Sequence, residues 1–224
     1  IYQCDWSSDV CSSDLTHFTQ RGRLGRLLGT LAEQLEAHSG QDVMAIGLDQ
    51  KTGLIIRDGL ARVEGLGDVD FIRKSASTEV KRDKQRAPKL SALVMDRLTE
   101  GFVFDLKQRH VVELNLPANA KRVHPSKIAK KALPVLVADA GDTDTRAFKH
   151  HVLFRKLYDG PATVGELHFK GTNGYIRVDA SAATVKSLSP YPSVYADADR
   201  RGAAGFVNLM VNVVAGEPAV PPAP

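Results

Sequence analysis

The chain has 224 residues, with 30 basic and 26 acidic side chains, a formal charge of +4 and 43% hydrophobic residues. This length fits one or two domains, and no apolar run reaches the roughly 20 residues that a membrane-spanning helix needs. The mild positive charge suits an acidic or polyanionic partner. It is far from the strong basicity typical of nucleic acid binding, so a nucleic acid partner is not expected.

Residues 1–15, IYQCDWSSDVCSSDL, are predicted to differ in origin from the rest of the chain. Within them, DWSSDVCSSDL is the translation of one reading frame of a common sequencing adapter. We therefore expect residues 1–15 to be non-native and the native sequence to resume at Thr16, in the middle of a gene. Both cysteines, the tryptophan and three aspartates lie in this segment, which leaves 30 basic and 23 acidic side chains, a formal +7. The remaining sequence lacks cysteine, which excludes a disulfide scaffold, thiol catalysis and a thiolate zinc site, but does not decide between cytoplasm and export.

Residues 16–72 are predicted to form the closing edge of an α/β domain. A loop leads into an amphipathic helix that ends near His38-Ser39-Gly40, because its leucines recur at offsets of three and four. Residues 43–49, VMAIGLD, predict a buried strand of the kind found in parallel sheets. Residues 54–72 predict short strands with a hairpin turn at Asp58-Gly59 and a second break at residues 65–68.

A β-rich module of unknown function is predicted for residues 90–215. Residues 73–89, RKSASTEVKRDKQRAPK, are strongly charged and predict an exposed linker before it. Residues 90–98 predict one short helix, and the rest predicts strands over residues 102–106, 110–116, 133–138, 148–157, 163–169, 175–178 and 206–214. The tail, residues 216–224, is rich in proline and is predicted to be disordered.

Residues 16–28, THFTQRGRLGRLL, combine a histidine with three arginines at a predicted helix start. Neutral imidazole can accept a proton at neutral pH, so His17 is a candidate general base. Arginines can bind carboxylates bidentately, which makes Arg21, Arg23 and Arg26 candidate substrate-binding residues. The alternative is a surface helix with basic residues and a structural histidine, and spacing alone favours it.

The same stretch resembles the cyanophycinase family of serine peptidases. Members typically read D-Q-H-F, then x-Q-R-G-R-x-G-R-L, and later G-I-G-I-D-E-x-T-A; here QRGRLGRL follows His17 in register, and AIGLDQKTG matches the later motif. The resemblance covers roughly residues 16–72. It implies a fold related to class I glutamine amidotransferases (flavodoxin-like), and a serine nucleophile on a G-T-S-A-G-like elbow activated by a histidine. By this resemblance His17 is the general base, and the three arginines shape a pocket for cyanophycin or a related β-aspartyl peptide.

Two departures from the family pattern bear on activity. No G-x-S-x-G occurs in the chain, so the resemblance implies a nucleophile upstream and a fragment that is inactive alone. The glutamate of the family's triad falls on Gln50, whose neutral amide can orient an imidazole but cannot stabilise the imidazolium as a carboxylate does. Either Asp49 substitutes, or the protein is slow, or it is a non-catalytic homologue with a polyanion-binding or anchoring module.

The remaining histidines suggest no metal site. His150 and His151 are predicted on opposite faces of a strand, so both cannot easily ligate one ion. His110, His124 and His168 lack ligand spacing to one another. No metal and no cofactor are expected, the expected partner is an aspartate- and arginine-rich peptide, no membrane association is expected, and a homodimer is left open.

Overall fold

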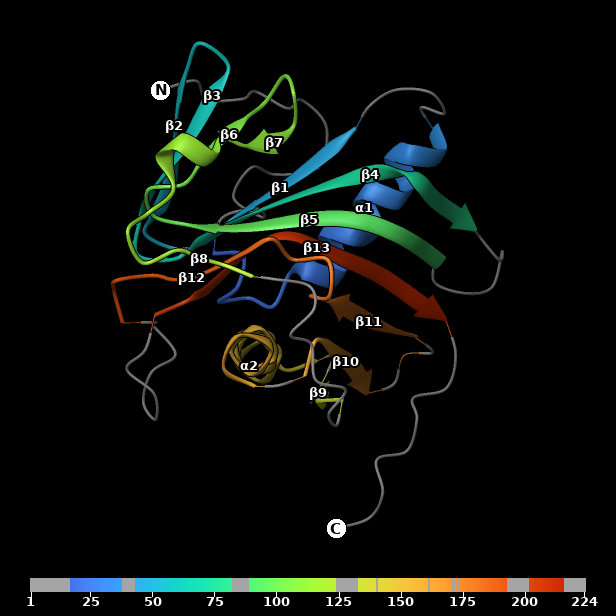
Figure 1. Cartoon of the computed structure of the whole chain (residues 1–224). Coiled ribbons are helices and arrows are strands. Elements are labelled where there is room, and N and C mark those ends of the chain that lie inside the picture. Colours follow the sequence, from blue (N-terminus) through green and yellow to red (C-terminus); the bar gives the residue numbers. More distant parts are fainter. Residues whose placement is uncertain are drawn as a thin grey trace.

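A large mixed sheet carries most of the chain in the computed structural model, which describes residues 17–37, 43–81, 89–123, 133–139, 141–160, 162–170, 172, 174–192 and 202–215. Its main path, shown in Figure 1, runs β1 (Met44–Leu48), β4 (Asp68–Lys81), β5 (Lys89–Thr99), β13 (Ala204–Ala215), β11 (Gly174–Asp179), β10 (Val164–Lys170) and β9 (Val135–Asp139). Beside it, β12 (Val185–Leu188) pairs with β13, and β8 (Lys121–Arg122) pairs with β12. The pairs along the path are antiparallel except β9 with β10.

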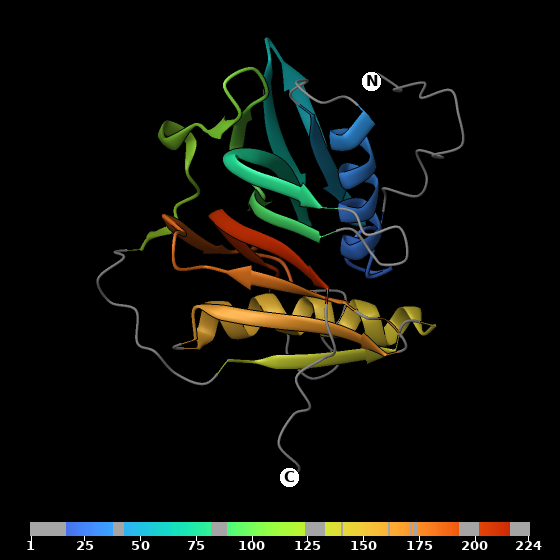
Figure 2. The ribbon, with the colours of Figure 1, turned by 90° about the vertical axis from the view of Figure 1, so that its right-hand side faces the viewer.

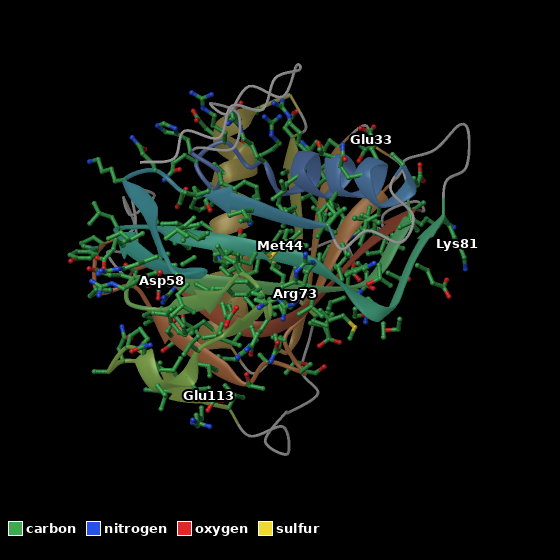
Figure 3. All side chains as sticks on the ribbon, turned by 90° about the horizontal axis from the view of Figure 1, so that it is seen from above. Glu33, Met44, Asp58, Arg73, Lys81 and Glu113 are labelled. Atoms are coloured by element: carbon green, nitrogen blue, oxygen red, sulfur yellow. The ribbon has the colours of Figure 1, made fainter. Side chains whose placement is uncertain are left out.

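A second sheet of four strands has the order β2 (Thr52–Arg57), β3 (Leu60–Gly65), β6 (Val103–Asp105) and β7 (His110–Val111), and a short 3-10 helix, η2 (Glu113–Asn115), follows it. The β2–β3 turn has positive φ at Asp58 (51°) and Gly59 (81°), as a tight hairpin requires. The predicted hairpin is therefore confirmed. Figure 3 shows Asp58 at this turn and Lys81 at the far end of β4, on opposite sides of the molecule.

The described residues include two α-helices, α1 (Leu24–Ala37) and α2 (Thr143–Asp159), which makes the fold mixed α/β. The leucine stripe of α1 is buried against β1 and β4, as its spacing predicts. Helix α2 connects the parallel strands β9 and β10, and Figure 2 shows it running alongside them. Both helices contribute to one core, while the small sheet packs on the other face of β4, where Phe71 and Phe104 stack at 4.1 Å.

The secondary structure predicted for the two segments on either side of residue 89 is wrong. The linker predicted for residues 73–89 is strand over residues 73–81, because β4 continues and pairs with β5. Its polar side chains are satisfied locally: the Ser75 and Thr78 hydroxyls both donate to the Ala92 carbonyl beside a register shift. The helix predicted for residues 90–98 is β5. Since β4, β5 and β13 share one sheet, the predicted boundary falls between two paired strands.

The strand predicted for residues 148–157 is also wrong, because these residues lie in α2. Asp142 caps this helix by accepting from the Asp144 amide, and its buried side chains follow helical spacing at Ala147, His150, Phe154 and Leu157. His150 and His151 are therefore neighbours on a helix and do not lie on opposite faces of a strand. The predicted strands over residues 102–106, 133–138, 163–169, 175–178 and 206–214 are confirmed within one or two residues. The strand predicted for residues 110–116 is wrong beyond Val111, because η2 follows β7, and β8 and β12 were not predicted. Residues 1–15, 82–88 and 216–224 lie outside the described residues.

Candidate functional site

Residues 17–23 form consecutive turns that lead into α1. The Arg21 amide donates to the His17 carbonyl, the Gly22 amide to the Thr19 carbonyl and the Arg23 amide to the Phe18 carbonyl, at 3.0 to 3.1 Å. His17 is half-buried and has a positive φ of 60°, uncommon outside glycine. The candidate base therefore stands at the start of a tightly folded turn.

This turn is hydrogen-bonded to the segment that ends β1, thirty residues further along the chain. The Phe18 amide donates to the Leu48 carbonyl at 3.0 Å, and the Thr19 amide donates to Oδ1 of Asp49 at 3.1 Å. In return, the Gln50 amide donates to Oε1 of Gln20 at 3.1 Å. The structure thus brings the histidine segment and the Gln50 segment together.

Two glycines allow this close approach. A Cβ at Gly47 would lie 2.7 Å from the ring of Phe18, so glycine lets the ring approach β1 this closely. Gly22 has a φ of +55°, and its Cβ would lie 2.4 Å from Cβ of Arg146 in α2. The turn is therefore packed between β1 and the start of α2, without room for side chains at these points.

The three candidate arginines do not share one environment. Arg23 is buried, with 7% of its surface exposed, whereas Arg21 and Arg26 are exposed. Gln50 is half-buried in the turn after β1, where its carbonyl accepts from the Thr52 hydroxyl. Two exposed guanidinium groups near His17 in sequence can meet an anionic substrate, while the Arg23 guanidinium belongs to the interior.

A buried charge cluster beneath the turn was missed by sequence reasoning. Arg97 in β5 donates from Nη1 to Oδ2 of Asp70 at 2.7 Å, and from Nη2 to Oδ2 of Asp68 at 2.6 Å. The same Nη2 donates to the Thr19 hydroxyl at 3.1 Å. Asp68 and Asp70 lie two residues apart on β4 and therefore share a face. The alternation of DVDF was the available signal, because two carboxylates on a core-facing side require a buried cation.

The cluster holds more acid than base, which sets its protonation. Burial is the largest cause that raises the pKa of Asp49, Asp68 and Asp70, and it raises the pKa of Asp70 to about 8. Arg97 opposes each shift, and the mutual repulsion of the carboxylates adds to the shifts at Asp49 and Asp70. The carboxyl groups of the cluster are therefore harder to ionise than exposed aspartates.

Aromatic rings of α2 close the cluster from above. The guanidinium of Arg97 lies 4.3 Å from the ring centroid of Phe154, and the ring of His150 packs edge-on between Phe18 and Phe154. Both ring nitrogens of His150 are buried and find no hydrogen-bond partner in the described structure. Burial lowers the pKa of His150 well below 6.5, so the ring is neutral and behaves as an apolar wall.

A separate histidine–carboxylate pair lies on β10, where Nε2 of His168 and Oε2 of Glu166 are 3.0 Å apart. His168 also stacks on Tyr175 of β11 at 4.4 Å. Over the part of the chain that the structure describes, no group of three histidine, cysteine or acidic side chains could hold a metal ion. Neither described helix is long and apolar enough to cross a membrane.

No protein-family model matches the chain, and a search of curated proteins finds no relative.

Proposed function

We propose that the chain is part of a serine-type peptidase of the cyanophycinase kind, which hydrolyses cyanophycin or a related β-aspartyl peptide. The observation that carries this proposal is the set of hydrogen bonds between the His17 turn and the end of β1. These bonds hold the residues that follow His17 against Leu48, Asp49 and Gln50, so the two motif segments of the resemblance lie side by side. The nucleophilic serine is supplied by sequence outside this chain.

His17 acts in this proposal as the general base that takes the proton of the serine hydroxyl. His17 is half-buried at the start of the turn, so part of the residue remains exposed. Gln50 orients the imidazole through its side-chain amide. Arg21 and Arg26, which are exposed, bind the carboxylates of the polyaspartate backbone, and Arg23 shapes the pocket from the interior.

The corresponding fold proposal is that residues 17–72 form the C-terminal edge of a class I glutamine amidotransferase-like domain. Strand β1 stands at the end of the sheet path and pairs with β4 alone among the described strands. A preceding domain with parallel strands would add to its open edge. The chain order α1, β1 and β2–β3 hairpin is the one expected for the closing edge of an α/β domain. The prediction of a buried strand in a parallel sheet for residues 43–49 is wrong, because β1 is mostly half-buried and pairs antiparallel with β4.

A non-catalytic homologue is the alternative, and the environment of Asp49 favours it. Gln50 carries no charge, and the carboxylate that would replace the family's acid is buried with Asp68 and accepts from the Thr19 amide. A triad without an ionised carboxylate stabilises the imidazolium poorly. In this case the protein would bind the polymer through its arginines without hydrolysing it.

Recovery of the uninterrupted gene, followed by labelling of its product with a serine-directed phosphonate, tests the catalytic proposal. We expect a G-T-S-A-G-like elbow upstream, a single labelled serine within it, and loss of labelling in His17→Ala. An upstream sequence without an elbow, or labelling that persists in His17→Ala, would refute the catalytic role.

The Gln50→Glu variant of the same protein separates the two functions. If the natural protein is a degenerate enzyme, this substitution creates or strongly raises hydrolysis, because a carboxylate returns to the triad. If the natural protein hydrolyses the polymer and Gln50→Glu is no faster, Gln50 already serves as the orienting residue. Gln50→Ala is the matched control, since it removes the side-chain amide without adding charge.

A further inference from the structure

Arg97, Asp68 and Asp70 form a buried cluster that is hydrogen-bonded to Thr19 in the turn that begins with His17. We propose that Arg97 is a positioning residue that holds the His17 turn in register with the end of β1, acting through Thr19. The catalytic importance of this register rests on the function proposed above. The register itself can be measured by hydrogen exchange and NMR, without an assay of hydrolysis.

Thr19 is the link because it is held from two sides. Its amide donates to Oδ1 of Asp49 at 3.1 Å, which ties the turn to the end of β1. Its hydroxyl accepts from Nη2 of Arg97 at 3.1 Å and donates to Oδ1 of Asp68 at 3.4 Å, which ties the turn to β4 and β5. Thr19 is therefore bonded to residues in or next to three strands, β1, β4 and β5. These bonds fix the position of His17, two residues earlier, relative to the core of the sheet.

The planar guanidinium explains why this role falls to an arginine. One Nη2 group serves both Asp68 and Thr19 while Nη1 serves Asp70, a fork that a lysine ammonium cannot reproduce in one geometry. The side chain is 1% exposed, so its bonds form in a medium of low dielectric. Buried ion pairs of this kind contribute little net stability relative to apolar residues, and their best-supported use is to specify one arrangement.

Helix α2 completes the arrangement from the opposite side. Phe154 covers the guanidinium at 4.3 Å, and His150 packs against the ring of Phe18, the residue between His17 and Thr19. Neither side chain takes a hydrogen bond from the cluster, since Phe154 has no polar side-chain atom and both ring nitrogens of His150 are buried without a partner in the described structure. The turn is thus packed between the cluster and α2. The contact with α2 extends the site into a segment that does not resemble the family.

The test compares Thr19→Val with Thr19→Ser in this chain. Valine has the shape of threonine without its hydroxyl, so it removes the link to Arg97 and Asp68 while the amide bond to Asp49 can persist. Serine restores the hydroxyl and is the rescue. Amide hydrogen exchange is measured at Phe18, at position 19 and in β5, and the ring resonances of His17 and of exposed His110 are followed by NMR.

We expect exchange at Phe18 and position 19 to rise on the order of tenfold in Thr19→Val, from loss of a hydrogen bond to a charged group. The His17 ring resonances should move or broaden, while His110 and the β5 amides stay close to wild type. Thr19→Ser should return all of these values to the wild-type range. In the intact enzyme, Thr19→Val should lower kcat with little change in KM, with recovery in Thr19→Ser.

An unchanged turn in Thr19→Val overturns the proposal, as does a rise in exchange that is equal in the turn and in β5. The latter result would make the cluster a general stabiliser of the core. Arg97→Lys supplies the second variant: a folded protein with an unaltered turn would likewise refute the role of the fork. If the turn responds but the intact protein has no hydrolytic activity with or without Thr19, the proposed function fails and the positioning role stands.

Discussion

Replacing Gly47 with alanine probes how closely the two motif segments fit together. The new methyl group would lie 2.7 Å from Cγ and Cδ2 of Phe18 and 2.8 Å from Cε2, well inside van der Waals contact. The Phe18 ring is fully buried and packs against His150 at 5.9 Å, and its own amide is bonded to Leu48. Neither the ring nor the strand can yield without losing one of these contacts.

Two opposing terms set the magnitude of the effect. Overpacking a close-packed core costs about 1–3 kcal/mol, whereas replacing glycine by alanine within a strand returns about 0.5–1 kcal/mol of backbone entropy. We therefore expect Gly47→Ala to lower the free energy of unfolding by about 1 kcal/mol and by at most about 2.5 kcal/mol. For a chain of this size the melting temperature should fall by about 2–4 °C per kcal/mol.

Urea denaturation and thermal melting measure this difference, with Gly53→Ala as the matched control. Gly53 lies in β2, and its Cβ would meet nothing within 4 Å, so that variant should be at least as stable as wild type. Phe18→Leu in the Gly47→Ala background should recover part of the loss, giving a favourable coupling in a double-mutant cycle. Equal stability of Gly47→Ala and Gly53→Ala would refute the packing of Phe18 on β1.

Three further variants test the turn and the buried cluster. Gly22→Ala should destabilise the protein more than Gly47→Ala in the same urea experiment, since it combines a φ of +55° with a Cβ 2.4 Å from Arg146, and a neutral effect would contradict the contact with α2. The pKa of Asp70 is raised from 3.8 to about 8, so its folded form holds a proton that the unfolded form releases, and this contribution to stability is lost as pH rises from about 4 to 8. Asp70→Asn should accordingly flatten the stability profile over that window, and an unaltered slope would contradict the shift. The pKa of His150 is lowered well below 6.5, so its contribution is present above pH 6.5 and lost as the pH falls, and His150→Leu should unfold at lower pH than wild type in an acid titration followed by circular dichroism. An unchanged acid midpoint in His150→Leu would contradict the claim that protonation of His150 contributes to acid unfolding.

Sequence patterns predicted the elements whose signal is local. The leucine spacing of α1 and the Asp58-Gly59 turn each depend on residues within one or two turns of chain, and both were confirmed. The strand β4 was missed over residues 73–81 because its polar side chains are satisfied by partners on β5, such as the Ala92 carbonyl. Residues 148–157 of α2 predict a strand because a short run of aromatic, aliphatic and β-branched residues is compatible with both the strand period of 2 and the helix period of 3.6.

The candidate site divides in the same way. His17 and the arginines could be selected from sequence, since their chemistry is carried by one stretch of thirteen residues, 16–28. The burial of each arginine depends on how the turn packs, and residue spacing does not predict it: Arg23 is buried, whereas Arg21 and Arg26 are exposed. The pairing of Arg97 with Asp68 and Asp70 joins residues almost thirty positions apart, and the contact of Arg97 with Thr19 spans seventy-eight. Only the alternating acids of β4 hinted that a buried cation was needed.

Release of β-aspartyl-arginine from cyanophycin by the intact protein tests the general-base role of His17 most directly, with His17→Ala compared with His110→Ala. His110 lies exposed in β7, on the small sheet, and serves as the matched histidine control. We expect wild type and His110→Ala to release the dipeptide at similar rates, and kcat of His17→Ala to be lower by at least about 100-fold, the range for loss of a general base. Full activity of His17→Ala, or no release by the wild-type protein, would contradict it.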